Sequence, residues 1–301
     1  METLHMRVFL TGATGFIGSA VVEELRAAGH RVTGLARSDA AAATLAEWGV
    51  EVRRGDVAQP EILAEAARAS DGVIHCAFGS DFSKYLEMGE TDLSAVSAMA
   101  EALAGSGKPF VVTSGLTAVT PGRASTEADA ADLGGPTSVR GRPEERALAA
   151  SGQNVRSVVV RLAPSVHDFQ RQGLVSLLIT AARQSGVSAY VGDGANRWPA
   201  VHRRDAARLF RLGLERGHPG ERLHAVAEEG VTLRSIAEAI GKGLGVPTRE
   251  IDPSDAANHF GWLSFAISSD MPASSALSRQ SVGWRPTGPG LLEGLSGDYL
   301  P

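Results

Sequence analysis

The sequence predicts an α/β protein built on a doubly wound parallel sheet with a smaller C-terminal lobe. Up to about residue 160, short continuous apolar runs alternate with helical segments of about ten residues or more, a pattern typical of successive strand–helix–strand units. The runs lack polar alternation, as expected for strands that are buried on both faces. A glycine-rich stretch lies between the first run and the first helical segment, at the strand end where such sheets bind ligands.

Each element of this first part has a local signal. Apolar residues at helical spacing favour a helix over 16–28, Ser38 or Asp39 is suited to cap the next helix, and Pro60 suits a first helical turn. We expect strands over 6–11, 31–36, 50–53, 72–77, 109–114 and 154–162. We expect helices over 16–28, 39–48, 60–70, 83–104 and about 143–150.

The glycine-rich stretch reads TGATGFIG over residues 11–18. Its glycines allow a tight turn, a close approach of the backbone to a pyrophosphate and close packing of the helix on the strand. The helix that follows points free N–H groups and a positive dipole end at bound phosphates. The sequence therefore predicts a Rossmann-type dinucleotide site formed by Thr11, Gly12, Thr14, Gly15, Phe16, Ile17 and Gly18.

The end of the second strand bears on the choice between NADP and NAD. An acidic residue there would bind a ribose 2′-hydroxyl, whereas a nearby arginine accommodates a 2′-phosphate. Arg37 and Ser38 occupy this place and favour NADP, while Asp39, one residue further on, leaves NAD as the alternative.

Beyond residue 162 the pattern loosens. Helices are expected over 173–184, 203–215 and 232–244, and strands near 187–191 and 222–226. No low-complexity linker marks a boundary. We interpret 1–164 as mainly the dinucleotide-binding core and 165–301 as mainly a substrate-binding lobe, with some segments returning to the core, in one structural unit.

The composition of the 301 residues excludes several classes of protein. A hydrophobic share of 43% is ordinary for a globular chain, and a net charge of −5 argues against a nucleic-acid partner. Because Cys76 is the only cysteine, an internal disulfide framework and a cysteine-based zinc cage are excluded, and no metal site is predicted. The apolar runs are too short for a signal peptide or a membrane span. We expect a soluble cytoplasmic protein without a membrane partner.

Several motifs, in this order along the chain, resemble those of the extended short-chain dehydrogenase/reductases. They are TGATGFIG, GDV at 55–57, VIHCA at 73–77 and VVTSG at 111–115. Two later stretches, RLAPSVHD at 161–168 and GDGANRWPAVHRRDAARLF at 192–210, resemble landmarks of the epimerase/dehydratase branch. The resemblance implies a small-molecule substrate and favours a homodimer.

The resemblance also implies a set of contacts around the cofactor. Asp56 and Val57 would lie along the adenine, and Pro164, Ser165 and Val166 would meet the nicotinamide end. Further cofactor contacts are expected from Cys76, Ala77, Phe78, Thr113 and Ser114. Substrate contacts are expected from Ser114, Gly115, Arg197 and His202.

The acid/base pair of this superfamily, a tyrosine and a lysine four residues apart, is absent. Position 89, four residues after Tyr85, and position 194, four after Tyr190, are both glycine, and the sequence of 301 residues ends before position 303, four after Tyr299. A local match on Glu145 puts the tyrosine position near Thr137 and the lysine position near Gly141. Arg140 and Arg142 are the only cations there, and arginine cannot relay a proton as lysine can. The candidate catalytic residues are His167, His202, Tyr85 and Thr117.

Three functions follow from these observations. The first is an NADP-dependent oxidoreductase that moves a hydride to or from a small carbonyl, imine or activated alkene with a non-standard proton donor. The second is a non-catalytic NADP-binding sensor or interaction protein. The third, a sugar-nucleotide epimerase or dehydratase, needs transient oxidation and therefore a base, which the missing tyrosine disfavours.

Overall fold

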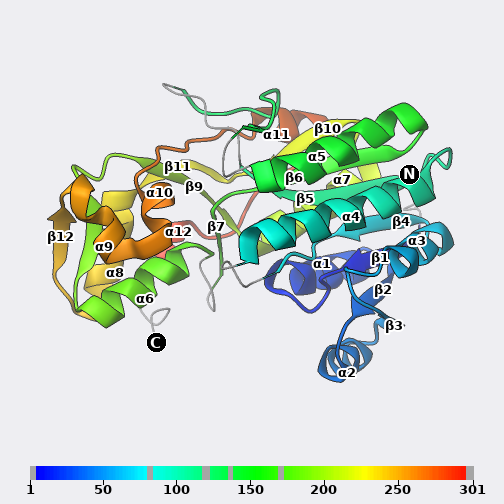
Figure 1. The fold of residues 1–301 in the computed structure, drawn as a ribbon, viewed down its shortest axis with the longest axis horizontal. Helices are drawn as coiled ribbons and strands as arrows, with labels where there is room; N and C mark the ends of the chain where they lie inside the picture. Colours follow the sequence, from blue (N-terminus) through cyan, green and yellow to red (C-terminus); the bar gives the residue numbers. More distant parts are fainter. Residues whose placement is uncertain (1–4, 80–83, 117–122, 135–137, 169–172, 296–301) are drawn as a thin grey trace.

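The computed structural model describes residues 5–79, 84–116, 123–134, 138–168 and 173–295. They form a main lobe around one large sheet and a distal lobe around two small sheets (Figure 1). The predicted α/β class with a doubly wound parallel sheet is confirmed. The predicted site residue Thr117 and the aligned position Thr137 lie outside the described residues.

The main sheet has seven strands in the order β10-β6-β5-β4-β1-β2-β3, and every neighbouring pair is parallel. Its strands are β1 (Arg7–Thr11), β2 (Arg31–Ala36), β3 (Glu51–Arg54), β4 (Gly72–His75), β5 (Pro109–Gly115), β6 (Arg156–Leu162) and β10 (Glu221–Ala225). The strand order reverses between β1 and β4, so the carboxyl ends of these two strands border the crevice where such sheets bind ligands. Thr11 and His75 are register partners at this point.

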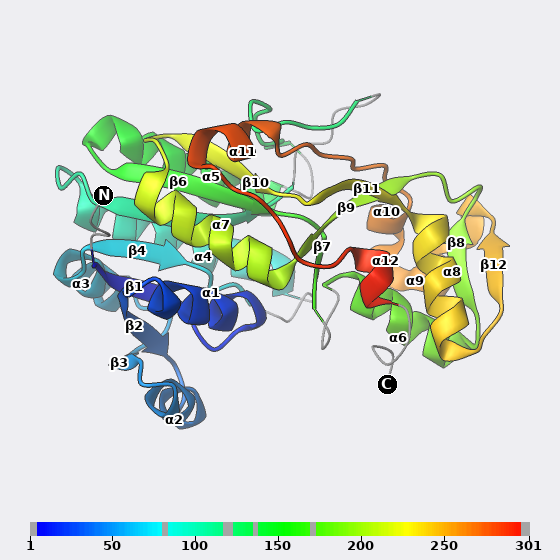
Figure 2. The ribbon, with the colours of Figure 1, turned by 180° about the vertical axis from the view of Figure 1, so that it is seen from behind.

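Helices cover both faces of the main sheet (Figure 1 and Figure 2). One face carries α1 (Phe16–Ala27) and α7 (Arg203–Arg216), and the other carries α3 (Pro60–Ala69), α4 (Tyr85–Leu103) and α5 (Ser138–Ala149). The alternation of β1 separates the two cores, because Val8 and Leu10 join the first cluster and Phe9 joins the second. The helix α2 (Asp39–Glu47) follows β2.

The distal lobe contains a three-stranded sheet in the order β11-β9-β7 and a two-stranded sheet of β12 and β8. Its strands are β7 (Ser165–His167), β8 (Ser188–Val191), β9 (Arg197–His202), β11 (Glu228–Thr232) and β12 (Thr248–Ile251). Its helices are α6 (Val175–Ser185), α8 (Leu233–Leu244), α9 (Ala256–Phe260), α10 (Ser264–Ile267) and α12 (Leu291–Gly294). A third apolar cluster, with Trp198 fully buried, holds this lobe together.

The chain crosses between the lobes more than once. After β9 it returns to the main sheet as α7 and β10, and α11 (Ala276–Val282) lies beside β10 before the chain reaches α12 in the distal lobe (Figure 2). Among the described helices, none is both long and apolar enough to span a membrane.

The structure corrects one predicted boundary. The helix was expected to begin at about residue 143, whereas α5 begins at Ser138 and carries Pro143 inside. The reason is tertiary: Val139 is buried and Arg140 forms an ion pair with α4, so these contacts hold an additional turn before the proline.

Candidate cofactor-binding and active site

The glycine loop joins β1 to α1 at the crevice. Gly12 has a φ of +69°, and a Cβ there would lie 2.7 Å from the backbone nitrogen of Ala77. A Cβ at Gly18 would overlap the carbonyl oxygen of Gly12. The first glycine is therefore needed for the left-handed turn against the β4 loop, and the last for close packing of α1 on the loop.

The N-terminus of α1 fits a pyrophosphate. Its N-cap residue is Gly15, which offers no side chain to cap the first N–H groups, and no acidic residue stands in the first turn. Uncapped N–H groups at a helix N-terminus bind phosphate oxygens. This arrangement suits a dinucleotide, and the individual residue contacts stay predictions.

Two arginines lie at the neighbouring carboxyl ends of β2 and β3. The side chain of Arg37 is 83% exposed and its Nε lies 3.6 Å from an Asp56 carboxylate oxygen. Arg54, at the end of β3, donates a 2.7 Å hydrogen bond to the Ser38 carbonyl and pairs with Asp39. The Ser38 hydroxyl accepts from the Ala41 amide and caps α2. The sequence analysis missed Arg54. The parallel pairing of β2 with β3, which places it beside Ala36, is the signal that would have found it.

The loop after β4 lines the other side of the crevice. The Ala77 amide donates to the Thr11 hydroxyl at 3.2 Å, and the Thr113 hydroxyl donates to the His75 carbonyl at 2.7 Å. Burial raises the pKa of the Cys76 thiol to about 12, so this thiol is neutral near pH 7. The adenine-side candidates Asp56 and Val57 follow β3, where the Asp56 carboxylate accepts from the amide of residue 58 in a tight turn.

A buried polar chain runs from the glycine loop to α5. The Thr11 hydroxyl and His75 Nδ1 are 2.7 Å apart, and His75 Nε2 lies 2.8 Å from one oxygen of Asp92. The other Asp92 oxygen accepts from Arg140 at 2.6 Å, and Arg140 also donates to the Thr113 carbonyl at 2.7 Å. Thr11, His75 and Asp92 are all buried. The sequence analysis did not identify His75 and Asp92 as site residues.

The guanidinium of Arg140 also faces an aromatic pair. Its Cζ atom lies 4.0 Å from the ring centroid of Phe78. Phe78 meets Tyr85 edge to face, with the ring centroids 6.1 Å apart. Two predicted site residues, Phe78 and Tyr85, are therefore brought together with Arg140 at the carboxyl ends of β4 and β5.

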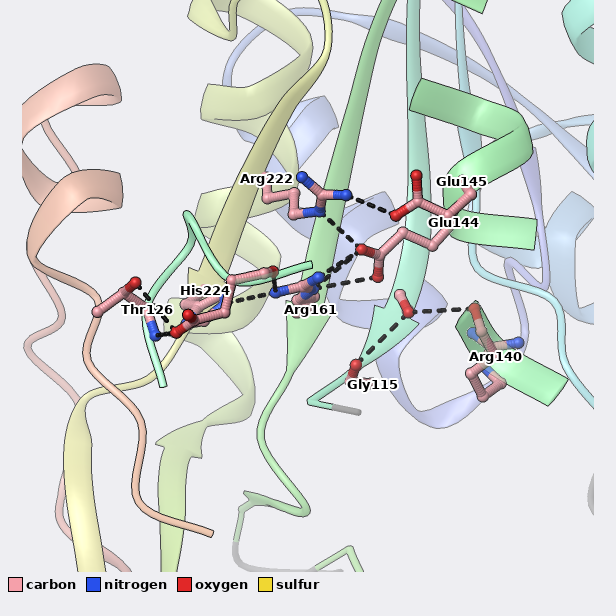
Figure 3. A network of polar contacts seen from close by, with 10 residues as sticks. Gly115, Thr126, Arg140, Glu144, Glu145, Arg161, Arg222 and His224 are labelled. Carbon is pink, nitrogen blue, oxygen red and sulfur yellow. Dashed lines mark hydrogen bonds and ion pairs between the residues drawn. The ribbon is translucent and has the colours of Figure 1, made fainter. Parts of the chain in front are cut away.

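Ser114 turns away from this group. Its buried hydroxyl lies 3.5 Å from the Gly115 carbonyl oxygen and 3.5 Å from the Arg140 carbonyl oxygen (Figure 3), and it lowers the pKa of Glu144. The Glu144 carboxylate accepts hydrogen bonds from Arg161 at 2.6 Å and from Arg222 at 2.8 Å, so two guanidiniums converge on it. Burial raises the pKa of Glu144, but the arginines outweigh burial and hold this pKa below its ordinary value. The Ser114 hydroxyl therefore lies beside this network, and its contacts with the cofactor and the substrate stay predictions.

The two candidate histidines lie in the small sheet of β7 and β9. His167 and His202 are register partners whose rings are 5.7 Å apart, and both side chains are buried. Burial lowers the pKa of both, that of His167 to about 4. Both rings are neutral near pH 7, and His202 accepts from the Arg204 amide as the N-cap of α7.

The remaining candidates are distributed over β7 and β9. Ser165 and Val166 are buried in β7 directly after Pro164. Arg197 begins β9 and forms a double hydrogen bond to Asp270, whereas His202 ends the strand. Five residues of strand separate the two side chains by roughly 17 Å. The structure therefore does not bring Arg197 and His202 to one place. Gly115 ends β5 with open space where a Cβ would stand.

The fold and the glycine loop define a nicotinamide-dinucleotide-binding protein of the Rossmann class. A family model described as the NAD dependent epimerase/dehydratase family matches residues 8–225. The chain belongs to this family, which confirms the resemblance read from the motifs. Family and fold together support an NAD(P)-dependent oxidoreductase of the epimerase/dehydratase type.

The chain is similar over nearly its whole length to two fungal proteins. It is 43% identical to the uncharacterized protein YLL056C of Saccharomyces cerevisiae, with 98% of this chain and 99% of that protein covered. It is 42% identical to the uncharacterized protein C2A9.02 of Schizosaccharomyces pombe, with 97% and 99% covered. Among solved structures, a double mutant of the dTDP-glucose 4,6-dehydratase DesIV of Streptomyces venezuelae, with NAD bound, matches with a TM-score of 0.75. The identity is 22%, with 97% of this chain and 95% of that chain covered, so this likeness concerns the fold.

Proposed function

We propose that the protein is an NADP-dependent oxidoreductase that transfers a hydride to or from a small carbonyl, imine or activated alkene without the usual tyrosine/lysine pair. The observation that carries the proposal is the pairing of an uncapped α1 N-terminus with two arginines, Arg37 and Arg54, around Ser38. NADPH, when bound, supplies the hydride that reduces the substrate carbon. The chain's own residues bind the pyrophosphate and the 2′-phosphate, and orient the substrate.

The preference for NADP is supported by charge. A 2′-phosphate placed between Arg37 and Arg54 would replace the carboxylates of Asp56 and Asp39, their present partners. NAD, which lacks this phosphate, would leave those ion pairs as they are. NAD therefore stays the alternative, although it has no 2′-phosphate to pair with the two arginines.

Direct binding measurements test this proposal. Isothermal titration of the wild type should give a lower Kd for NADPH than for NADH. Arg37→Ala and Arg54→Ala should each raise the NADPH Kd about tenfold or more, the loss of one charge-assisted hydrogen bond, and leave the NADH Kd unchanged. Arg53→Ala is the matched control, because Arg53 precedes Arg54 in β3 and pairs with Glu65. Equal Kd values for the two cofactors in the wild type would refute the NADP preference.

The absence of a tyrosine/lysine motif supports a second candidate, a non-catalytic NADP-binding sensor or interaction protein. The two functions separate when NADPH oxidation is followed against a panel of aldehydes, ketones, imines and enones. Tight NADPH binding without turnover of any compound would favour the sensor. A sugar-nucleotide epimerase or dehydratase ranks third, because transient oxidation needs a base.

A further inference from the structure

Three aromatic and cationic side chains meet where the carboxyl ends of β4 and β5 open onto the crevice. Phe78 comes from the loop after β4, Tyr85 from the first turn of α4 and Arg140 from the first turn of α5. Phe78 contacts both of the others, with the Arg140 guanidinium against its face and Tyr85 at its edge. This cluster, Phe78–Tyr85–Arg140, places a phenol near a fixed positive charge.

The close approach of α5 depends on Gly89. This residue lies one helical turn after Tyr85 on α4, and a Cβ there would overlap the side chain of Val139, the neighbour of Arg140. A Cβ at position 89, where the usual motif would require a lysine after Tyr85, would need the Val139 side chain to move and would lie 3.3 Å from the Val139 carbonyl oxygen. The glycine at this position therefore leaves room for Val139, the neighbour of Arg140, to pack against α4.

Arg140 is held rigidly. Asp92 and the Thr113 carbonyl accept its hydrogen bonds, and His75 and Thr11 extend the chain of contacts to the base of the glycine loop. The Arg140 side chain is only 11% exposed, so solvent screens its charge weakly. A guanidinium anchored at this depth can stabilise a neighbouring anion without itself losing a proton.

We propose that Tyr85 is the catalytic acid of this site and that Arg140 stabilises the phenolate which Tyr85 becomes. The inference rests on the proposed function. In the direction of carbonyl reduction, the carbonyl carbon accepts the hydride, the π electron pair moves to the oxygen, and this oxygen takes the Tyr85 proton. The product is an alcohol, and the phenolate recovers a proton from water. In this step Asp92 is a positioning residue for Arg140.

The competing donors are less suitable. Burial lowers the pKa of both His167 and His202, so their rings are neutral near pH 7 and are poor acids. Burial raises the pKa of Tyr85 above its ordinary value, the positive charge of Arg140 offsets only part of this rise, and the negative charge of Asp92 adds a smaller one. Without Arg140 the Tyr85 pKa would be higher still, so the guanidinium favours the phenolate that proton donation leaves behind.

The coupling of the two side chains is measurable without cofactor. In protein labelled with ¹³Cζ-tyrosine, the chemical shift of Tyr85, assigned through Tyr85→Phe, reports the phenol pKa. Arg140→Gln should raise this pKa by about one unit or more, and Arg140→Lys, which keeps the charge, should restore most of the wild-type value. The double variant Asp92→Asn/Arg140→Gln, which leaves no unpaired buried charge, should show a smaller rise in the same direction.

A second tyrosine–arginine pair provides the matched control. On the distal lobe, the Arg234 guanidinium lies 5.4 Å from the ring centroid of Tyr190. Arg234→Gln should leave the Tyr85 resonance and its pKa unchanged. An unchanged Tyr85 pKa in both Arg140→Gln and the double variant would overturn the assignment of Arg140.

Kinetics then separate this inference from the proposed function. Tyr85→Phe should reduce turnover about 10²- to 10⁴-fold, with an NADPH Kd within about threefold of the wild-type value, whereas Tyr190→Phe should keep full turnover. If Tyr85→Phe retains wild-type turnover, the inference fails and the proposed function stands. If the wild type does not bind NADPH, the proposed function fails, while the NMR titration still decides whether Arg140 acts on Tyr85.

Discussion

Arg161 is a fully buried charge that, among the described residues, forms an ion pair with one carboxylate. Glu144 balances it, and neither side chain is exposed to solvent (Figure 3). Removing one partner of a buried pair leaves an uncompensated charge, at a cost of about 3–5 kcal/mol. Glu144→Gln should therefore lower the free energy of unfolding by that amount in urea titrations. Glu90→Gln is the control, because the Glu90–Arg142 pair is exposed and is worth at most about 1 kcal/mol. Equal effects of the two changes would contradict this account.

His167 makes the stability depend on pH. Its pKa is about 4 in the fold, lowered by burial and by the charge of His202, against about 6.5 in the unfolded chain. The contribution is complete above pH 6.5, where both states are neutral, and is lost as the pH falls toward 4. Between pH 7 and pH 5 the loss is about 2 kcal/mol. His167→Asn should remove that part of the pH dependence in paired urea titrations. A variant with the wild-type pH dependence would argue against a neutral buried ring.

Single residues of the site differ in how far the sequence predicts them. The glycine loop is local, and its spacing alone indicated the dinucleotide site. Arg54, His75 and Asp92 became visible only when strand register and the packing of α4 on α5 placed them beside Ser38, Thr11 and Arg140. The local sequence does not indicate such contacts, because the partners lie far apart in the chain.

At the scale of elements, the β1–α1 turn is the part most sensitive to an added methyl group. Gly12→Ala should raise the NADPH Kd more than tenfold, because its Cβ would displace the loop from Ala77. Gly186→Ala is the control: this residue also has a positive φ, of +70°, but nothing lies within 4 Å of its Cβ position. The control should lose about 1–2 kcal/mol of stability and keep its NADPH affinity. A similar loss of affinity in both variants would indicate a global effect rather than a local one.

Elements stabilised by local patterns agree with the sequence, and those stabilised by distant pairing do not. The helix expected over 16–28 is α1 (Phe16–Ala27), and the strand expected over 31–36 is β2. The strands β7, β9, β11 and β12 were not predicted. They have three to six residues, and each pairs with a segment remote in the chain, as Thr248 does with Ser188. Hydrophobic periodicity cannot specify such strands, because their burial depends on the partner.

The predicted homodimer is tested on the whole molecule. We consider the outer face of α4 and α5 as its contact surface. There Arg142 pairs with Glu90 and Arg146 with Glu101, so a second copy would have to replace or accommodate these ion pairs. The homodimer stays a prediction. Light scattering after size-exclusion chromatography should give twice the chain mass of 31.3 kDa if it is correct. A monomer mass at micromolar concentration would contradict it.

The lobes should unfold as one unit, because the second half of the chain completes the first. In the main sheet β10 pairs with β6, and α7 packs on the face that α1 also covers. A fragment of residues 1–164 lacks both, so it leaves an open edge on β6 and exposes apolar side chains such as Val158, which pack in the same core as Leu214 and Leu223. We expect this fragment to show no cooperative thermal transition and to bind a hydrophobic dye, whereas the whole chain shows a single transition in calorimetry. A cooperatively folded fragment, or two separate transitions in the whole chain, would show that 1–164 and 165–301 are independent domains.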